Sequence, residues 1–333
     1  MDFEVTNNVG NDEWQEIANR CSYATFFHTP SWFVAFSETY SRCEIVTKRF
    51  LFVDGTVALL PLMKQRTLGN FHKSYLIGPA GCYGGWISSS DLGLEHITAI
   101  AEWIFRNLRS FTWRLNPLDE RTALFERDAT VVDTTEMLFL RDFQDEAQLW
   151  KSFKRSVRKE INKAERAELM VKVAENWNEW EKYIGLYKMA LNRWGDKATS
   201  KYHMDLFKNL FGLKSDKIKL WLVMRQGDII GGNLNFYHNK HCVEWHAAFD
   251  SRYFGIGARN YLVAQIISDA MHRGYVTYDF NPSGSHEGTR RFKQAFGTSQ
   301  VSADLIVLDK TPYSVRSVKK LLRLFRRFVT RTR

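Results

Sequence analysis

The chain has 333 residues, a length that favours two compact units of about 150 residues each. With 44% hydrophobic and 25% charged residues, the composition excludes a disordered protein and fits an ordinary globular one. The first 14 residues have neither the basic start nor the apolar run of a secretory signal, and no stretch approaches the roughly 18 apolar residues of a membrane span. The four cysteines have no metal-ligand or redox spacing, so we expect no metal site and a reducing, cytoplasmic location.

The net charge of +10 is concentrated at the C-terminal end. Residues 310–333 contain nine Lys or Arg and no acid, whereas residues 1–309 hold 38 basic and 37 acidic residues. The body is therefore nearly neutral, and the basic character belongs to a tail.

The first half predicts a mixed α/β unit. Residues 45–63 indicate two strands around Asp54-Gly55, a dipeptide typical of a hairpin turn. An amphipathic helix is expected at 93–109, where apolar residues recur at helical spacing. Further strands are expected at 74–88, 111–116 and 130–140.

The second half begins with a long helix predicted at 145–169, where Leu149, Phe153, Val157 and Ile161 fall on one face. The other face is dense in Lys and Arg, a pattern usual for a solvated surface. The remaining elements follow in order: a strand at 170–174, helices at 177–194 and 201–212, a long hairpin at 218–250 with turns at 226–228 and 238–240, a helix at 257–273, and a strand at 275–280.

The similar element order in both halves suggests a duplicated fold with a boundary near residue 142. We therefore predict an N-terminal domain at 1–141, a C-terminal domain at 142–309, and a basic amphipathic helix at 310–333.

A glycine-containing segment, Arg252-Tyr253-Phe254-Gly255-Ile256-Gly257-Ala258, lies between a predicted strand and a predicted helix. Glycines there let the backbone approach an anion, and exposed N–H groups at a helix start favour phosphate. The R-x-x-G-x-G pattern resembles the pyrophosphate loop of GNAT acetyltransferases. Arg252, Gly255, Gly257 and Ala258 are thus candidate coenzyme A contacts, although two glycines also suit a plain strand–helix turn.

Residues 270–297 resemble the signature of the FemAB family of acyl and aminoacyl transferases. The matching groups are Tyr278-Asp279-Phe280, Asn281-Pro282-Ser283, Arg291-Phe292-Lys293 and Phe296-Gly297. Residues 27–36 and 154–169 also look like this family, so the resemblance extends from about 27 to 300. It implies an α/β fold with mixed sheets, arranged as two tandem GNAT-like domains, with the active site mainly in the second.

The resemblance implies that Lys293 neutralises charge at the reacting carbonyl and that Phe292 shapes the pocket. A fixed cation beside the oxyanion of an aminolysis reaction lowers the barrier by several kcal/mol. From the residues alone, Arg291 and Lys293 would instead be surface charges flanking a buried Phe292. Asp279, Asn281, Ser283, His246 and Arg291 complete the expected substrate cleft.

The reaction also needs a base, because an ammonium cannot attack a carbonyl. Glu244 ranks first, since its neighbours are apolar and burial of a carboxyl disfavours its charged form. Glu244 and His246 are two residues apart on a predicted strand, so we expect them on one face. His286, Glu287 and Asp279 are the other candidates.

The leading hypothesis is an N-acyltransferase that moves an acyl group from a thioester to an amine of a small molecule, a sugar or a cell-envelope precursor. Acyl-CoA or an acyl carrier protein is the expected donor, and no permanently bound cofactor is expected. One alternative is a tRNA-dependent aminoacyltransferase of the peptidoglycan-bridge type. The near-neutral body and a single helix at 145–169 speak against it. Another is a non-catalytic, membrane-associated adaptor with a transferase fold.

The tail at 313–333 has one apolar face and one face of Lys and Arg. Such a helix can lie on an anionic membrane surface, bind RNA phosphates, or pack its apolar side on the body. The first option would place the protein on the inner face of the membrane.

Overall fold

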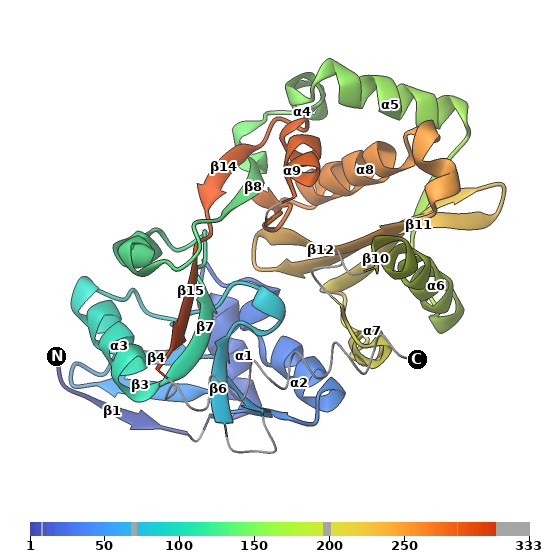
Figure 1. The fold of residues 1–333 in the computed structure, drawn as a ribbon. Helices are drawn as coiled ribbons and strands as arrows, with labels where there is room; N and C mark the ends of the chain where they lie inside the picture. The colour runs from blue at the N-terminus through green and yellow to red at the C-terminus, as the bar shows by residue number, and fades with distance from the viewer. Residues whose placement is uncertain (8, 68–71, 196–200, 285, 311–333) are drawn as a thin grey trace.

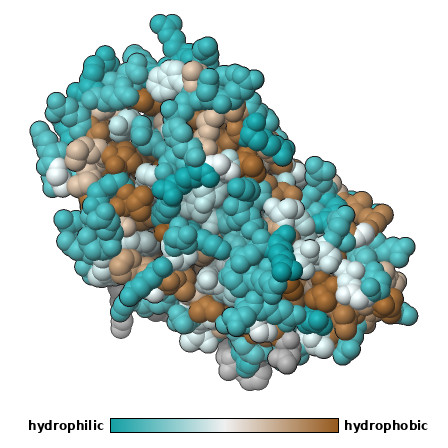
Figure 2. Space-filling view, turned by 180° about the vertical axis from the view of Figure 1, so that it is seen from behind, coloured by the Kyte–Doolittle hydropathy of each residue, from teal (hydrophilic) through white to brown (hydrophobic). Residues whose placement is uncertain are grey.

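The computed structural model describes residues 1–310 except residues 8, 68–71, 196–200 and 285. These residues form a mixed α/β protein with two lobes, and helices cover both faces of the larger sheet (Figure 1). Seen from the opposite side, the surface is largely hydrophilic with separate hydrophobic patches (Figure 2). Within the described residues, no helix is both long and apolar enough to cross a membrane.

The first lobe contains two sheets. The predicted hairpin at Asp54-Gly55 is present as β3 (Lys48–Phe52) and β4 (Val57–Leu60), and β1 (Phe3–Thr6) completes the three-stranded order β1-β3-β4. The five-stranded sheet has the order β15-β7-β6-β5-β2. The strands are β1 (Phe3–Thr6), β2 (Cys43–Ile45), β3 (Lys48–Phe52), β4 (Val57–Leu60), β5 (Met63–Thr67), β6 (His72–Ile77), β7 (Ser110–Arg114) and β15 (Leu305–Asp309). The helices are α1 (Asn11–Arg20), α2 (Pro30–Thr39) and α3 (Leu94–Asn107).

The second lobe is built on a seven-stranded sheet with the order β14-β8-β13-β12-β11-β10-β9. Its strands are β8 (Thr134–Phe139), β9 (Met170–Val173), β10 (Ile218–Arg225), β11 (Asp228–His238), β12 (His241–Phe249), β13 (Thr277–Asp279) and β14 (Ser299–Ser302). Its helices are α4 (Glu146–Ser152), α5 (Arg155–Arg166), α6 (Trp177–Trp194), α7 (Met204–Gly212), α8 (Ala258–His272) and α9 (Glu287–Gln294). Helices α5, α8 and α9 lie on one side of this sheet and α6 on the other (Figure 1).

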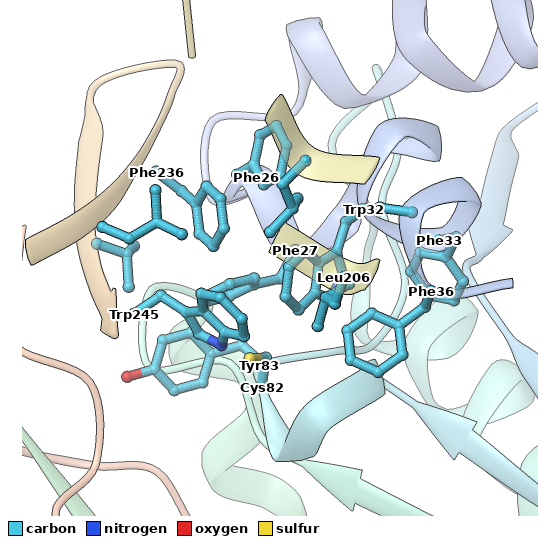
Figure 3. Close-up of a cluster of buried hydrophobic side chains, with 14 of the residues drawn as sticks. Phe26, Phe27, Trp32, Phe33, Phe36, Cys82, Tyr83, Leu206, Phe236 and Trp245 are labelled. Atoms are coloured by element: carbon cyan, nitrogen blue, oxygen red, sulfur yellow. The ribbon is translucent and has the colours of Figure 1, made fainter. Parts of the chain in front are cut away.

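The two lobes share one hydrophobic core. Phe27 and Trp32, from the segment that resembles the FemAB family near the N-terminus, are fully buried. Their rings lie 5.7 and 5.2 Å from the ring of Phe236 on β11, and Trp32 lies 5.3 Å from Trp245 on β12 (Figure 3). Aromatic side chains of this size dominate the energetics of a core. The N-terminal segment therefore supports the strands that carry the candidate site.

Each half of the chain also contributes one strand to the lobe formed mainly by the other half. Strand β8 precedes residue 142 but pairs with β13 and β14 of the seven-stranded sheet. Strand β15 lies in the second half of the chain but pairs with β7 of the first lobe. The division into 1–141 and 142–309 remains our proposal, with one strand exchanged in each direction.

The prediction of a single long helix at 145–169 is wrong, because the structure has two helices in this region, α4 and α5. The helical backbone ends at Phe153, whose buried ring packs 5.2 Å from Phe296. The Lys154 N–H then donates to the Ala295 carbonyl over 2.8 Å instead of to its own helix. This contact with a residue 141 positions later explains a break that local helical spacing does not reveal.

The tail predicted as an amphipathic helix at 313–333 lies outside the described residues.

Candidate functional site

The centre of the site is strand β12, which is irregular at Trp245. Leu234 of β11 pairs with His246, whereas Asn235 pairs with Glu244, so the pairing register shifts around Trp245. An extra residue of this kind is a β-bulge, which reverses the alternation of side chains beyond it. Glu244 and His246 therefore point to opposite faces of the sheet, and the expectation that they share one face is wrong.

Glu244 lies on the α8 side of the sheet and is only 6% exposed. Its Oε2 atom accepts a hydrogen bond from the buried Tyr278 hydroxyl on β13 over 3.1 Å. The carboxylate is thus held by its neighbouring strand and faces the cleft described below.

His246 lies on the α6 side, where its Nδ1 is 2.5 Å from the Tyr183 hydroxyl. The rings of Tyr187 and Phe207 lie 4.4 and 5.2 Å away. Burial lowers the pKa of this imidazole to about 3, so the side chain is neutral at physiological pH. These contacts suit a structural hydrogen bond better than a proton acceptor for the reaction.

A cleft of about 780 Å³ opens beside β12 and the start of α8. Of the predicted site residues, those that line it are Glu244, His246, Gly257, Ala258, Asn281, Ser283, Phe292 and Lys293. His286, a candidate base, also lines it. Arg252, Gly255, Asp279, Glu287 and Arg291 are not among its lining residues.

Lys293 lies on α9 and is buried, with an exposed fraction of 4%. The interpretation of this residue as a surface charge is therefore wrong. Its Nζ donates to the Asn281 carbonyl over 2.6 Å, a contact that Asn281 makes from a left-handed backbone conformation (φ +60°). Burial lowers the pKa of Lys293 to about 8, although the nearby Glu244 carboxylate acts in the opposite direction. A cation of limited hydration thus faces the cleft.

Sequence reasoning missed Arg259, the second residue of α8. Its guanidinium carbon lies 3.8 Å from the centre of the Phe292 ring, and the side chain lines the cleft. Its Nε atom is buried without a hydrogen-bond partner among the described residues. Burial lowers the pKa of this arginine, an effect that the Glu244 carboxylate opposes. The only signal in the sequence is a basic residue directly after Gly257-Ala258.

The glycine-containing segment forms a short 3₁₀ helix from Ser251 to Ile256. The Arg252 guanidinium forms a 2.6 Å ion pair with Asp250, while its side chain is 75% exposed. Gly257 has φ +76°, and a Cβ atom there would lie 2.1 Å from the Glu160 carbonyl oxygen on α5. This close approach and the left-handed backbone together require glycine. They set the position of α8, whose start has no side-chain cap.

The residues around β13 divide between core and cleft. Asp279 is 1% exposed, with Oδ1 accepting from the Thr135 hydroxyl and from the Asn281 N–H. Burial raises the pKa of the Asp279 carboxyl. Arg291 is exposed and forms an ion pair with Glu287 one helical turn away.

Comparison with known families now identifies this part of the chain. Residues 151–294 match the family model of the acetyltransferase (GNAT) domain. This region is a GNAT domain. The match includes Glu244, Gly257, Arg259 and Lys293, and therefore the whole cleft.

Solved structures extend the likeness to the full chain. FemX matches with a TM-score of 0.70 at 12% identity, over 95% of this chain and 99% of its own. A tandem GNAT protein from the clavulanic acid biosynthesis pathway matches at 0.54 and 8% identity, over 93% and 99%. L-PGS from Bacillus licheniformis matches at 0.51 and 14% identity, over 89% and 96%. A search of curated proteins found no match. The predicted mixed α/β fold with two GNAT-like domains and the FemAB-like character of that fold are confirmed.

Proposed function

We propose that this protein is an N-acyltransferase that moves an acyl group from a thioester donor to an amine. The donor would be acyl-CoA or an acyl carrier protein, and the acceptor a small molecule, a sugar or a cell-envelope precursor. The observation that carries the proposal is the buried Lys293 cation, which lies in the cleft of a GNAT domain together with the Glu244 carboxylate.

Lys293 has the properties required of an electrostatic catalyst. When an amine attacks a thioester carbonyl, a C–N bond forms and negative charge develops on the carbonyl oxygen. The Nζ atom is fixed by the Asn281 carbonyl and retains two further protons for donation. A fixed donor in a largely dry site stabilises such an oxyanion far more than one in water. The charge returns to the carbonyl as the C–S bond breaks and the thiolate leaves.

Glu244 is our proposed proton acceptor. The amine loses one proton as the amide forms, and a carboxylate that lines the cleft can receive it directly or through one water. Tyr278 fixes one carboxylate oxygen, which leaves the other for this role. Phe292 would shape the pocket, as the family resemblance implies, by covering one face of Arg259.

We place the donor at the start of α8, where Gly257 and Ala258 line the cleft. The first N–H groups of a helix have no partner within the helix and favour an anion such as a pyrophosphate. Arg252 and Gly255 stay in this proposal as contacts at the outer edge of the loop.

The second candidate is transfer of an aminoacyl group from charged tRNA. The whole-chain likeness to the fold of FemX favours it, and the same Lys293 would serve, since an ester aminolysis passes through the same kind of oxyanion. A membrane surface or RNA bound by 313–333, a cytoplasmic or inner-membrane location, and a non-catalytic adaptor role remain hypotheses of lower rank.

Thermal melting with and without acetyl-CoA and coenzyme A tests the donor. A ligand at one hundred times its dissociation constant adds about 2.7 kcal/mol of stability. We expect a rise in Tm that is weakened in Gly255→Val, a position where a Cβ meets open space and the fold should persist. Unchanged melting at millimolar ligand would move the donor to charged tRNA or a carrier protein.

Thiol release from acetyl-CoA, measured with a panel of amines, then tests the reaction itself. Turnover with any amine that is lost in Glu244→Gln would support the proposed base. If an acyl-CoA binds but no amine is acylated, the result would favour the hypothesis of a non-catalytic adaptor.

A further inference from the structure

The floor of the cleft contains two cations close to one carboxylate. Arg259 and Lys293 both line the cleft, and both have pKa values on which the charge of Glu244 acts. Neither forms an ion pair with any of the described residues at 4.0 Å or less. Both cations therefore lie near the Glu244 carboxylate without forming a salt bridge with it, and Asp279 and Glu136 also act on Lys293.

Hydrogen-bond donors in this part of the cleft exceed the acceptors that satisfy them. The Arg259 Nε atom is buried and has no partner among the described residues. The Ser283 hydroxyl, which lines the same cleft, is also buried without a partner in the described part of the chain. Among the described residues, Lys293 donates to one carbonyl oxygen, that of Asn281. Burying an unpaired donor is unfavourable, more so for a charged group, so such an arrangement is expected where a ligand supplies the acceptors.

The Phe292 ring packs against the guanidinium of Arg259. The guanidinium carbon lies over this ring, 3.8 Å from its centre, so the ring covers one side of the charged group. A planar fork of donors matches a carboxylate or phosphate, which can accept two parallel hydrogen bonds. In the mechanism proposed above, Lys293 stabilises the negative charge that develops on the carbonyl oxygen during the reaction. That mechanism assigns no role to the charge of Arg259.

We propose that Arg259, stacked on Phe292 and helped by Ser283, forms an anion subsite for a permanently charged carboxylate or phosphate of a substrate. This inference deepens the proposed function: the acyl group or the amine acceptor would carry an acidic group close to the reacting carbonyl. Arg259 would then determine specificity, whereas Lys293 would act on the transition state.

Binding of simple anions tests the subsite without any need for turnover. The probes are sodium acetate and inorganic phosphate, with acetamide as the neutral analogue of acetate and sodium chloride as the ionic-strength control. Stability of the full chain is measured by thermal and chemical denaturation across a concentration series, which yields a dissociation constant for each probe.

The variants are Arg259→Gln, which removes the charge, and Arg259→Lys, which keeps the charge without the fork. Arg273→Gln is the matched control, because Arg273 is an exposed arginine just after the same helix and is paired with Asp269. We expect Arg259→Gln to weaken binding of the preferred anion at least ten-fold, Arg259→Lys to have an intermediate effect, and Arg273→Gln to have none. Preference for acetate or for phosphate then identifies the charged group.

Three results would overturn the subsite. They are equal stabilisation by chloride at the same ionic strength, equal stabilisation by acetamide, and unchanged anion binding in a folded Arg259→Gln protein. The outcome is separate from that of the proposed function. Anion binding without acylation of any amine by acetyl-CoA would support the subsite and contradict the proposed acyl-CoA-dependent transfer, whereas acylation without Arg259-dependent anion binding would do the reverse.

Discussion

In the described part of the chain, two parallel strand pairs are each joined by a helix, β6–α3–β7 and β12–α8–β13, and they differ where the helix begins. At the start of α3, the His96 Nδ1 accepts from the Gly93 N–H over 3.1 Å, and its Nε2 lies 2.9 Å from Asp54 of the β3–β4 turn. At the start of α8, no side chain caps Gly257, and the adjacent residues line the cleft.

The space beside the strands differs in the same way. Next to β7, the rings of Trp86, Trp113 and Phe125 fill the region, with centres 5.5–5.8 Å apart. Next to β12 and β13, the corresponding region holds the cleft with Glu244 and Lys293. The two units therefore share a topology but differ in their sites: the second has a helix start without a side-chain cap and a buried cation in the adjacent cleft.

The strongest test of this difference is Lys293→Met. Loss of the fixed cation should lower kcat about 100- to 1,000-fold, the range seen when one oxyanion donor is removed. Stability should be unchanged or higher, because an apolar side chain of similar length replaces a buried charge. The measurement is single-turnover acyl transfer together with chemical denaturation.

Lys208→Met, at an exposed lysine of α7, is the control and should retain full activity. A Lys293→Met enzyme within three-fold of wild type would remove Lys293 from the mechanism.

The two helix starts can be compared directly through Gly257→Ala and Gly93→Ala. At Gly257, the methyl group would meet a carbonyl oxygen at 2.1 Å from a left-handed backbone, so we expect a loss of about 2–3 kcal/mol in the free energy of unfolding. At Gly93, the nearest atom, His96 Nδ1, is 3.4 Å away and φ is −70°, so the change should stay under about 1 kcal/mol. Urea denaturation of both variants measures the difference. Equal losses would show that α5 yields to the new methyl group.

Some features of the fold and of the site can be predicted from the sequence, and others cannot. The turn at Asp54-Gly55, the helix at α3 and the position of Lys293 follow from local patterns and from the family resemblance. The bulge at Trp245 breaks the period of two that placed Glu244 and His246 on one face. The end of α4 at Phe153 depends on a hydrogen bond to the carbonyl of residue 295. Arg259 becomes a candidate site residue only once its contact with Phe292 is known. The bulge depends on pairing with the adjacent strand, and the other two features depend on contacts with residues far away in the sequence.

Alkaline pH provides a smaller test of Lys293. Its pKa is about 8 in the folded protein and about 10.5 in the unfolded chain. Between these values the unfolded chain binds more protons, so the free energy of unfolding attributable to Lys293 rises with pH. Relative to Lys293→Met, the free energy of unfolding of wild type should therefore rise by about 1.6 kcal/mol between pH 8 and 9.5. Denaturation of both proteins across this range measures the gain, and parallel curves would place the lysine in water. The same deprotonation should lower activity as pH rises above 8.

The smallest expected effect separates the two faces of β12. Tyr183→Phe removes the hydroxyl that pairs with His246 on the α6 side, and Tyr278→Phe removes the one that holds Glu244 on the cleft side. Losing a buried hydrogen bond should lower stability by about 1 kcal/mol in both variants. Only Tyr278→Phe should alter the pH profile of acyl transfer, because only this hydroxyl contacts the proposed base. If Tyr183→Phe changed that profile instead, proton transfer would belong to His246, which also lines the cleft, and not to Glu244.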